Sequence, residues 1–160
     1  MRPLDKFVTQ KNETTIHKPI KTNMGVVTDW VTKKCRTEGT RNGYYKSLLN
    51  FLRSIYGENQ YPRFPTHQIN KTQQIRRRTI DDGIEHYLSE NRNFTEDFNT
   101  FILWLNKNKY APKSIHATLS TTKKFFSRHG HKLTDEEWED IRMLLAPNKP
   151  RTQDKTLTKE

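Results

Sequence analysis

The residues of this sequence that could do chemistry are mainly cationic, and their spacing gathers several of them on one side of a helix. Over residues 113–129, a step of about 100° per residue separates polar from apolar positions. The polar side combines cations with small residues, namely Lys113, Ser114, Ala117, Ser120, Thr121, Lys124 and Arg128. Small side chains let a helix approach a nucleic-acid groove closely, while lysine and arginine beside them can meet phosphates. The pattern predicts a binding surface for duplex DNA.

Two further groups of residues could extend this surface. An earlier helix carries Lys46, Asn50 and Arg53 opposite its apolar side, and Arg76-Arg77-Arg78 ends a polar stretch. One polar helix face alone is usually just solvated, and an arginine run can equally keep a loop soluble. Two such faces, the arginine run and a net charge of +11 together favour a polyanionic partner. A basic surface gains affinity by releasing the counterions of such a partner.

Other reactive residue types lack the partners that catalysis or metal binding needs. His116, His129 and His131 have a single cysteine, Cys35, far away in the sequence, and no spacing typical of a zinc site. The acidic runs Asp81-Asp82 and Asp135-Glu136-Glu137 stand where we expect helices to begin, and the helix dipole accounts for them. The sequence has neither a glycine-rich phosphate loop nor a serine-nucleophile motif. We therefore predict no metal, no cofactor and no small-molecule substrate.

Helices must position these residues, because apolar residues recur at intervals of three and four and no segment reads as a strand. We predict helices over about 29–39, 40–56, 80–90, 95–108, 113–129 and 134–146. Thr40, Thr95 and Thr134 are the expected N-caps, and Gly57 and Gly130 the expected C-terminal stops. The predicted fold class is all-α, a small bundle of two crossed helical hairpins plus an extra C-terminal helix, with flexible termini.

The polar segments divide the chain. Residues 1–27 lack a sustained period and are predicted to be a disordered basic arm, followed by a helical domain over 28–147 and a tail over 148–160. Within the domain, 58–78 is predicted to be a long basic loop. One cysteine, no signal-peptide pattern and no run of about 18 apolar residues favour a cytoplasmic chain without a membrane contact.

Two parts of the chain read alike and resemble a known family. Segments 40–57 and 114–130 each run from a hydroxyl cap to a bulky apolar pair and a glycine. The residues that carry the resemblance are Phe101-Ile102-Leu103-Trp104-Leu105, Tyr110-Ala111-Pro112-Lys113-Ser114-Ile115, Leu119-Ser120 and Phe125-Phe126. They resemble the second hairpin of the core-binding domain of tyrosine recombinases (the phage integrase family). Residues 29–57 look like the first hairpin, and 154–160 look like the junction that leads to the catalytic domain.

The resemblance covers about residues 28–160 and implies a DNA-binding module for site-specific recombination and DNA integration. It implies that the helices over 40–56 and 113–129 face duplex DNA in one half of a C-shaped clamp, where other recombinase protomers could be partners. Bound to DNA, such a module would be associated with the nucleoid. The family's catalytic residues (an arginine, a His-x-x-Arg pair and a tyrosine nucleophile) lie downstream of the junction. None can be carried over, so we expect no enzyme activity from these residues.

The chain also departs from the family, and two alternatives stay open. The 58–78 segment is longer than expected between the hairpins, and Thr122 stands where leucine is more common. One alternative is a self-contained helix-turn-helix regulator, which would bind a palindromic site as a dimer. The other is a helical protein-interaction module whose basic face meets an acidic partner. Low sensitivity of binding to DNA length and salt would favour the second.

Overall fold

The computed structural model describes residues 24–63 and 70–145, and these residues form six α-helices. The helices are α2 (Val26–Lys34), α3 (Glu38–Tyr56), α4 (Asn70–Ser89), α5 (Phe94–Lys107), α6 (Pro112–Arg128) and α7 (Asp135–Leu144). No strand occurs in the two described ranges, which confirms the predicted all-α fold class. Among their helices none is long and apolar enough to span a membrane.

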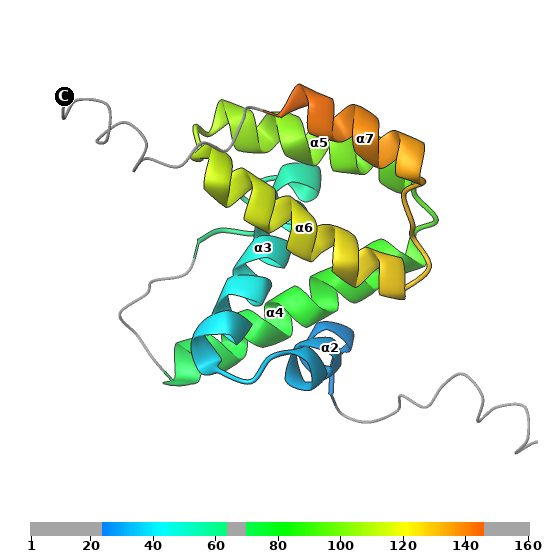
Figure 1. The fold of residues 1–160 in the computed structure, drawn as a ribbon. Helices are drawn as coiled ribbons and strands as arrows, with labels where there is room; N and C mark the ends of the chain where they lie inside the picture. Colours follow the sequence, from blue (N-terminus) through cyan, green and yellow to red (C-terminus); the bar gives the residue numbers. More distant parts are fainter. Residues whose placement is uncertain (1–23, 64–69, 146–160) are drawn as a thin grey trace, which may run out of the picture.

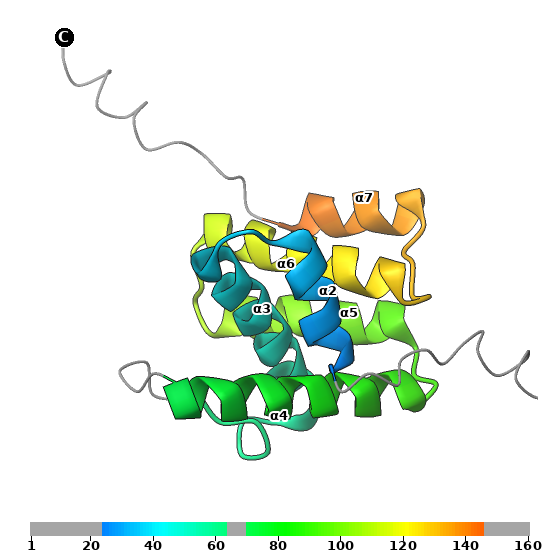
Figure 2. The same cartoon turned by 90° about the horizontal axis from the view of Figure 1, so that it is seen from below.

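The helix α3 lies at the centre of the molecule and packs against α2, α4, α5 and α6. Figure 1 shows α6 crossing in front of α3. Figure 2 shows α4 along one side of the molecule and α6 and α7 along the other, with α2, α3 and α5 between them. Whether these helices form two crossed hairpins stays a prediction.

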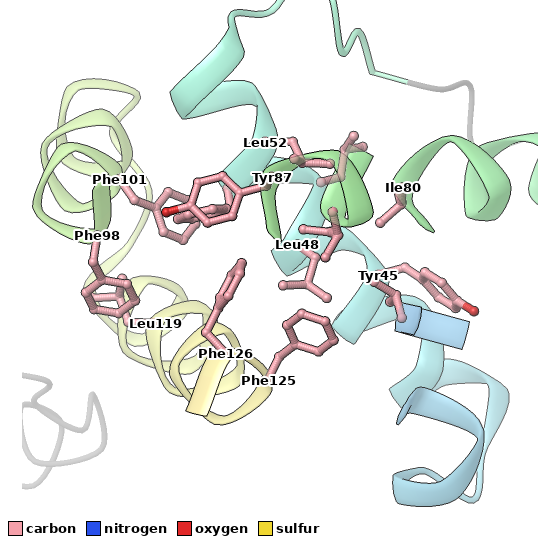
Figure 3. Close-up of a cluster of buried hydrophobic side chains, with 14 of the residues drawn as sticks. Tyr45, Leu48, Leu52, Ile80, Tyr87, Phe98, Phe101, Leu119, Phe125 and Phe126 are labelled. Atoms are coloured by element: carbon pink, nitrogen blue, oxygen red, sulfur yellow. The ribbon is translucent and has the colours of Figure 1, made fainter. Parts of the chain in front are cut away.

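An aromatic cluster holds four of the helices together. The ring of Phe51 (α3) lies 5.1 Å from Tyr87 (α4), 5.3 Å from Phe101 (α5) and 4.9 Å from Phe126 (α6), centroid to centroid. All four side chains are fully buried, and Figure 3 shows the labelled rings of Tyr87, Phe101 and Phe126 facing a common space. Each such ring removes a large apolar area from water, so this cluster fixes how α6 is seated.

The helix ends correct two predicted caps and confirm three other signals. Thr37, rather than Thr40, caps α3, because its side chain accepts a hydrogen bond from the backbone N–H of Thr40 at 3.2 Å. Asn93, rather than Thr95, caps α5 in the same way. The predicted cap Thr134 forms a full capping box with α7, and the two predicted stops, Gly57 and Gly130, have positive φ angles of 102° and 91°.

The basic arm predicted over 1–27 is too long, because Val26 and Val27 begin α2. Val27 is fully buried, and α4 holds this end of α2 in place. The carboxylate of Asp81 accepts hydrogen bonds from the backbone N–H groups of Val27 at 2.7 Å and Thr28 at 2.9 Å. Asp81 is therefore not at the start of its own helix, as predicted, but caps the start of another one. Residues 1–23 and 146–160, which include the whole predicted tail over 148–160, lie outside the described residues.

The loop predicted over 58–78 is wrong in its last part, because residues 70–78 form the first half of α4. This half contacts α3 through polar groups and so shows no apolar period. The Arg77 guanidinium donates to Glu38 at 2.6 Å and to Asn42 at 2.9 Å, and it lies 4.6 Å from the ring centre of Tyr45. Gln73 also donates to Asn42, at 3.0 Å. Residues 64–69 lie outside the described part of the chain.

Candidate nucleic-acid interface

The exposed side of α6 gathers the seven residues that the sequence predicted for this helix. Pro112 at the first position suits a helix start, since the N–H it lacks would have no partner there. One side of α6 is buried through Ile115, Leu119, Thr122, Phe125 and Phe126. The predicted residues lie on the other side, where five are exposed and two half-buried: Lys113, Ser114, Ala117, Lys124 and Arg128, with Ser120 and Thr121.

Thr122 is a polar residue that fits this core without a polar penalty. Its side chain is fully buried, and its hydroxyl donates to the backbone carbonyl of Thr118, one turn earlier, at 2.9 Å. A hydroxyl that bonds within its own helix loses no hydrogen bond on burial. The threonine can therefore be buried at this position without an unsatisfied hydroxyl.

The charge of α6 has one sign. The helix contains Lys113, Lys123, Lys124 and Arg128 and no aspartate or glutamate. Lys123 lies over the ring of Trp138 in α7, 4.8 Å from its centre, so the other three cations are the ones directed away from the neighbouring helix. Lys113 and Arg128 are separated by about 22 Å along the helix axis, with Ala117, Ser120 and Thr121 between them.

Of the three residues predicted for a DNA-binding face on α3, only the first is exposed. Lys46 is exposed, but Asn50 and Arg53 are buried, with only 6% and 4% of their surface accessible. The Arg53 guanidinium donates to the backbone carbonyl of Tyr61 at 2.9 Å and pairs with Glu58 at 3.2 Å. It thus fastens the segment after α3 and is not available to a phosphate. Periodicity located the side opposite the apolar residues but could not show that the chain folds back over it.

The arginine run does not extend the α6 surface, because α4 and α6 lie on opposite sides of the molecule (Figure 2). Arg78 is exposed. Arg77 is occupied by Glu38 and Asn42. Arg76 is half-buried and has no hydrogen bond or ion pair with any other described residue. The predicted DNA-binding residues therefore form separate groups, of which α6 is the largest.

Beside α6 lies the acidic helix α7 (Figure 1), whose effect on the surface could not be predicted. Its carboxylates are those of Asp135, Glu136, Glu137, Glu139 and Asp140, against the single cation Arg142. Hydrogen bonds from the Thr95 side chain and the Thr134 backbone lower the pKa of Glu137. A polyanion that meets α6 is therefore repelled along this border.

A buried polar network joins the end of α4 to the start of α5, and sequence reasoning missed it. Asp97 accepts hydrogen bonds from the Tyr87 hydroxyl at 2.7 Å and from Arg92 Nε at 2.8 Å. Burial and the bond to Asp97 raise the pKa of Tyr87 well above its usual value. Tyr87 and Asp97 are buried and hydrogen-bonded to each other, whereas the Arg92 side chain is 37% exposed, so the network orders this corner of the fold.

The remaining reactive residues are also held by structural contacts. Cys35 is a buried free thiol, and desolvation raises its pKa. The His129 ring hydrogen-bonds the Phe125 carbonyl at 2.8 Å and stacks on the Phe125 ring. In the described ranges, no group of three or more His, Cys, Asp or Glu could hold a metal ion.

No family model, curated protein or solved structure matches this chain. What it binds must follow from its own surface.

Proposed function

We propose that this chain is a duplex-DNA-binding module whose contact surface is the exposed side of α6. The observation that carries the proposal is the composition of that side. It is free of acidic residues, has small residues at its middle, and has exposed cations towards both ends. The opposite side of the same helix is locked into the aromatic core through Phe125 and Phe126.

The geometry suits a helix lying in a major groove. The groove is about 12 Å wide and admits an α-helix. Ala117, Ser120 and Thr121 would let the backbone come close to the base edges, while Lys124 and Arg128 reach phosphates. Because the core fixes α6 before any ligand arrives, little conformational entropy is lost on binding. The phosphate contacts supply most of the affinity, and Ser120 and Thr121 are the candidates for base readout.

The resemblance to the tyrosine-recombinase core-binding domain supports a more specific form of this proposal. The module grips duplex DNA in site-specific recombination or integration, and the bond-breaking chemistry belongs to residues outside this set. The all-helical fold and the exposed α6 side are compatible with that role. The α3 contribution shrinks to Lys46, because Asn50 and Arg53 are buried.

The test is binding to a labelled duplex of about 30 base pairs, titrated with salt between about 50 and 200 mM. Each neutralised phosphate contributes about −0.9 to the slope of log K against log salt, so Lys124→Ala/Arg128→Ala should flatten the slope by about 2. The matched control is Arg63→Ala/Lys107→Ala, which removes one arginine and one lysine from exposed positions outside α6.

The proposal requires the α6 variant to lose affinity and slope together while the control keeps both. Equal losses in the two variants would mean that only the total charge matters. If the wild type ignores DNA at the lowest salt, the α6 surface binds something else, and an acidic protein becomes the next partner to test.

A further inference from the structure

In the first half of α4, arginine stands at a position that continues the buried side of the helix. The buried side of this helix runs through Ile80, Ile84 and Tyr87. Residues four apart lie one above the other on a helix, so Arg76 stands directly before Ile80, and Arg77 directly before Asp81. The buried stripe therefore continues as Arg76, in a position where an apolar side chain would be expected, while Arg77 lies in line with the polar residue Asp81.

A third arginine and a single carboxylate complete this cluster. Glu38, at the start of α3, accepts from Arg77 Nη2 at 2.6 Å and from Arg41 Nη1 at 3.4 Å. It is the only carboxylate among the described residues that forms an ion pair with Arg41, Arg76 or Arg77. Arg41 and Arg77 thus share one carboxylate between α3 and α4, and Arg76 lies within the electrostatic reach of Arg77.

The cluster has donors that nothing in the described part of the chain satisfies. The Nε atoms of Arg41, Arg76 and Arg77 are buried and have no hydrogen-bond partner there. Desolvation and then the charge of Arg77 lower the pKa of Arg76, and no acidic group within the two described ranges offsets either effect. Among the described residues Arg76 thus has no counter-charge, and a half-buried cation without one is costly.

We propose that Arg41, Arg76 and Arg77 form a binding site for a phosphate oxyanion at the junction of α3 and α4. The planar fork of a guanidinium matches two oxygens of a phosphate, and a buried charge-assisted hydrogen bond is stronger than a neutral one. The site is partly open to solvent, because the side chains of Arg41 and Arg77 are 31% and 24% exposed, whereas their Nε atoms are buried. The ligand is either a backbone phosphate of a nucleic acid or a free phosphate group.

Glu38 acts as an internal competitor for this ligand. Its carboxylate occupies donors of Arg41 and Arg77 that a phosphate would use, and these two contacts lower its pKa. Removing its charge should therefore strengthen phosphate binding, whereas a residue that merely orders the arginines would weaken binding when lost. The two roles predict changes of opposite sign, so Glu38→Gln distinguishes them.

The experiment is a titration of the full chain with inorganic phosphate, at constant ionic strength held with chloride, followed through the arginine Nε–H resonances. Arg76→Gln should weaken phosphate binding by about tenfold, the loss of one charge-assisted contact. Arg78→Gln, a change at the next exposed arginine of the same helix, should leave it unchanged. Glu38→Gln should tighten it.

Two results would overturn the site: equal effects of Arg76→Gln and Arg78→Gln, or no tightening with Glu38→Gln. Binding of the same variants to the labelled duplex shows whether the phosphate belongs to a nucleic acid. If Arg76→Gln weakens both ligands, the phosphate belongs to a nucleic acid; if it weakens only inorganic phosphate, the ligand is a free phosphate group. Because phosphate is titrated without DNA, this outcome does not depend on the α6 surface.

Discussion

Replacing Asp81 should destabilise the fold far more than its place in the middle of α4 would suggest. The residue is 6% exposed, and its carboxylate accepts three hydrogen bonds from the start of α2. Two come from the backbone N–H groups of Val27 and Thr28, and the third comes from the Thr28 hydroxyl at 2.5 Å. In Asp81→Ala, these donors lose their acceptor, and the burial of Val27 prevents water from replacing it.

The size of the effect follows from two terms. Loss of a helix N-cap costs about 1 kcal/mol, and a buried donor left unsatisfied costs about 1–3 kcal/mol more. We expect Asp81→Ala to lower the free energy of unfolding by about 3 kcal/mol, which for a domain of this size is a fall in Tm of roughly 12 °C. Asp82→Ala is the matched control, since Asp82 is exposed and has no hydrogen bond or ion pair with another described residue.

The assay is urea unfolding followed by tryptophan fluorescence, because Trp30 of α2 stacks on Tyr44 and reports on this helix. Asp81 and Asp82 variants that differ by less than about 0.5 kcal/mol would refute the cap. A second check uses Gly25, where an added Cβ would lie 2.2 Å from Asp81 Cγ. Gly25→Ala should be costly in the wild type and much less costly in Asp81→Gly, because this change removes both Asp81 Cγ and Asp81 Cβ, which would lie 2.5 Å from the added Cβ.

Three further perturbations test other contacts. Tyr87→Phe should reduce the loss of stability on raising the pH above about 10: the raised pKa means that folded Tyr87 holds its proton more tightly than unfolded Tyr87, so its stabilisation is lost as the pH rises. Identical alkaline slopes of urea stability would contradict this. Cys35 should react with iodoacetamide at pH 8 at least about tenfold more slowly in the folded chain than in urea, since burial raises its pKa; equal rates would show that the thiol is accessible. Thr134→Ala should cost about 1 kcal/mol by removing the capping box, whereas Thr100→Ala, at an exposed mid-helix position, should cost little in the same unfolding assay. Equal losses would argue against the cap.

The sequence predicted well those helices whose packing is apolar. The recurring apolar residues of α5 and α6, such as Phe98, Phe101, Leu119 and Phe125, are the ones that the structure buries. Burial of apolar surface dominates the free energy of folding, so a period in apolar residues reports directly on the side that faces the core. The same reasoning located the exposed side of α6 without any knowledge of its neighbours.

What could not be predicted depends on contacts between polar residues far apart in the sequence. The first half of α4 packs through Arg77, Gln73 and Asn42, and a pattern search for apolar residues finds nothing there. Asp81 was predicted at a helix start, because carboxylates are favourable there. It does lie at a helix start, but the helix is α2, where its partner Val27 is 54 residues away in the sequence. Arg53 has the same chemistry as an exposed arginine, and only the return of the chain at Tyr61 buries it.

The distribution of charge, more than its total, bears on the proposed contact with DNA. The net charge of +11 would attract a polyanion to any face, but the described helices divide it unevenly. Four cations and no acid lie on α6, whereas α7 beside it carries five acids and one arginine. Screening reaches about 8–10 Å at physiological salt, which is close to the spacing of packed helices, so the field of α7 still acts at its border with α6. A duplex placed on α6 would therefore be repelled at the flank next to α7. The acidic helix would fix the direction in which the duplex leans, which a symmetric basic surface cannot do.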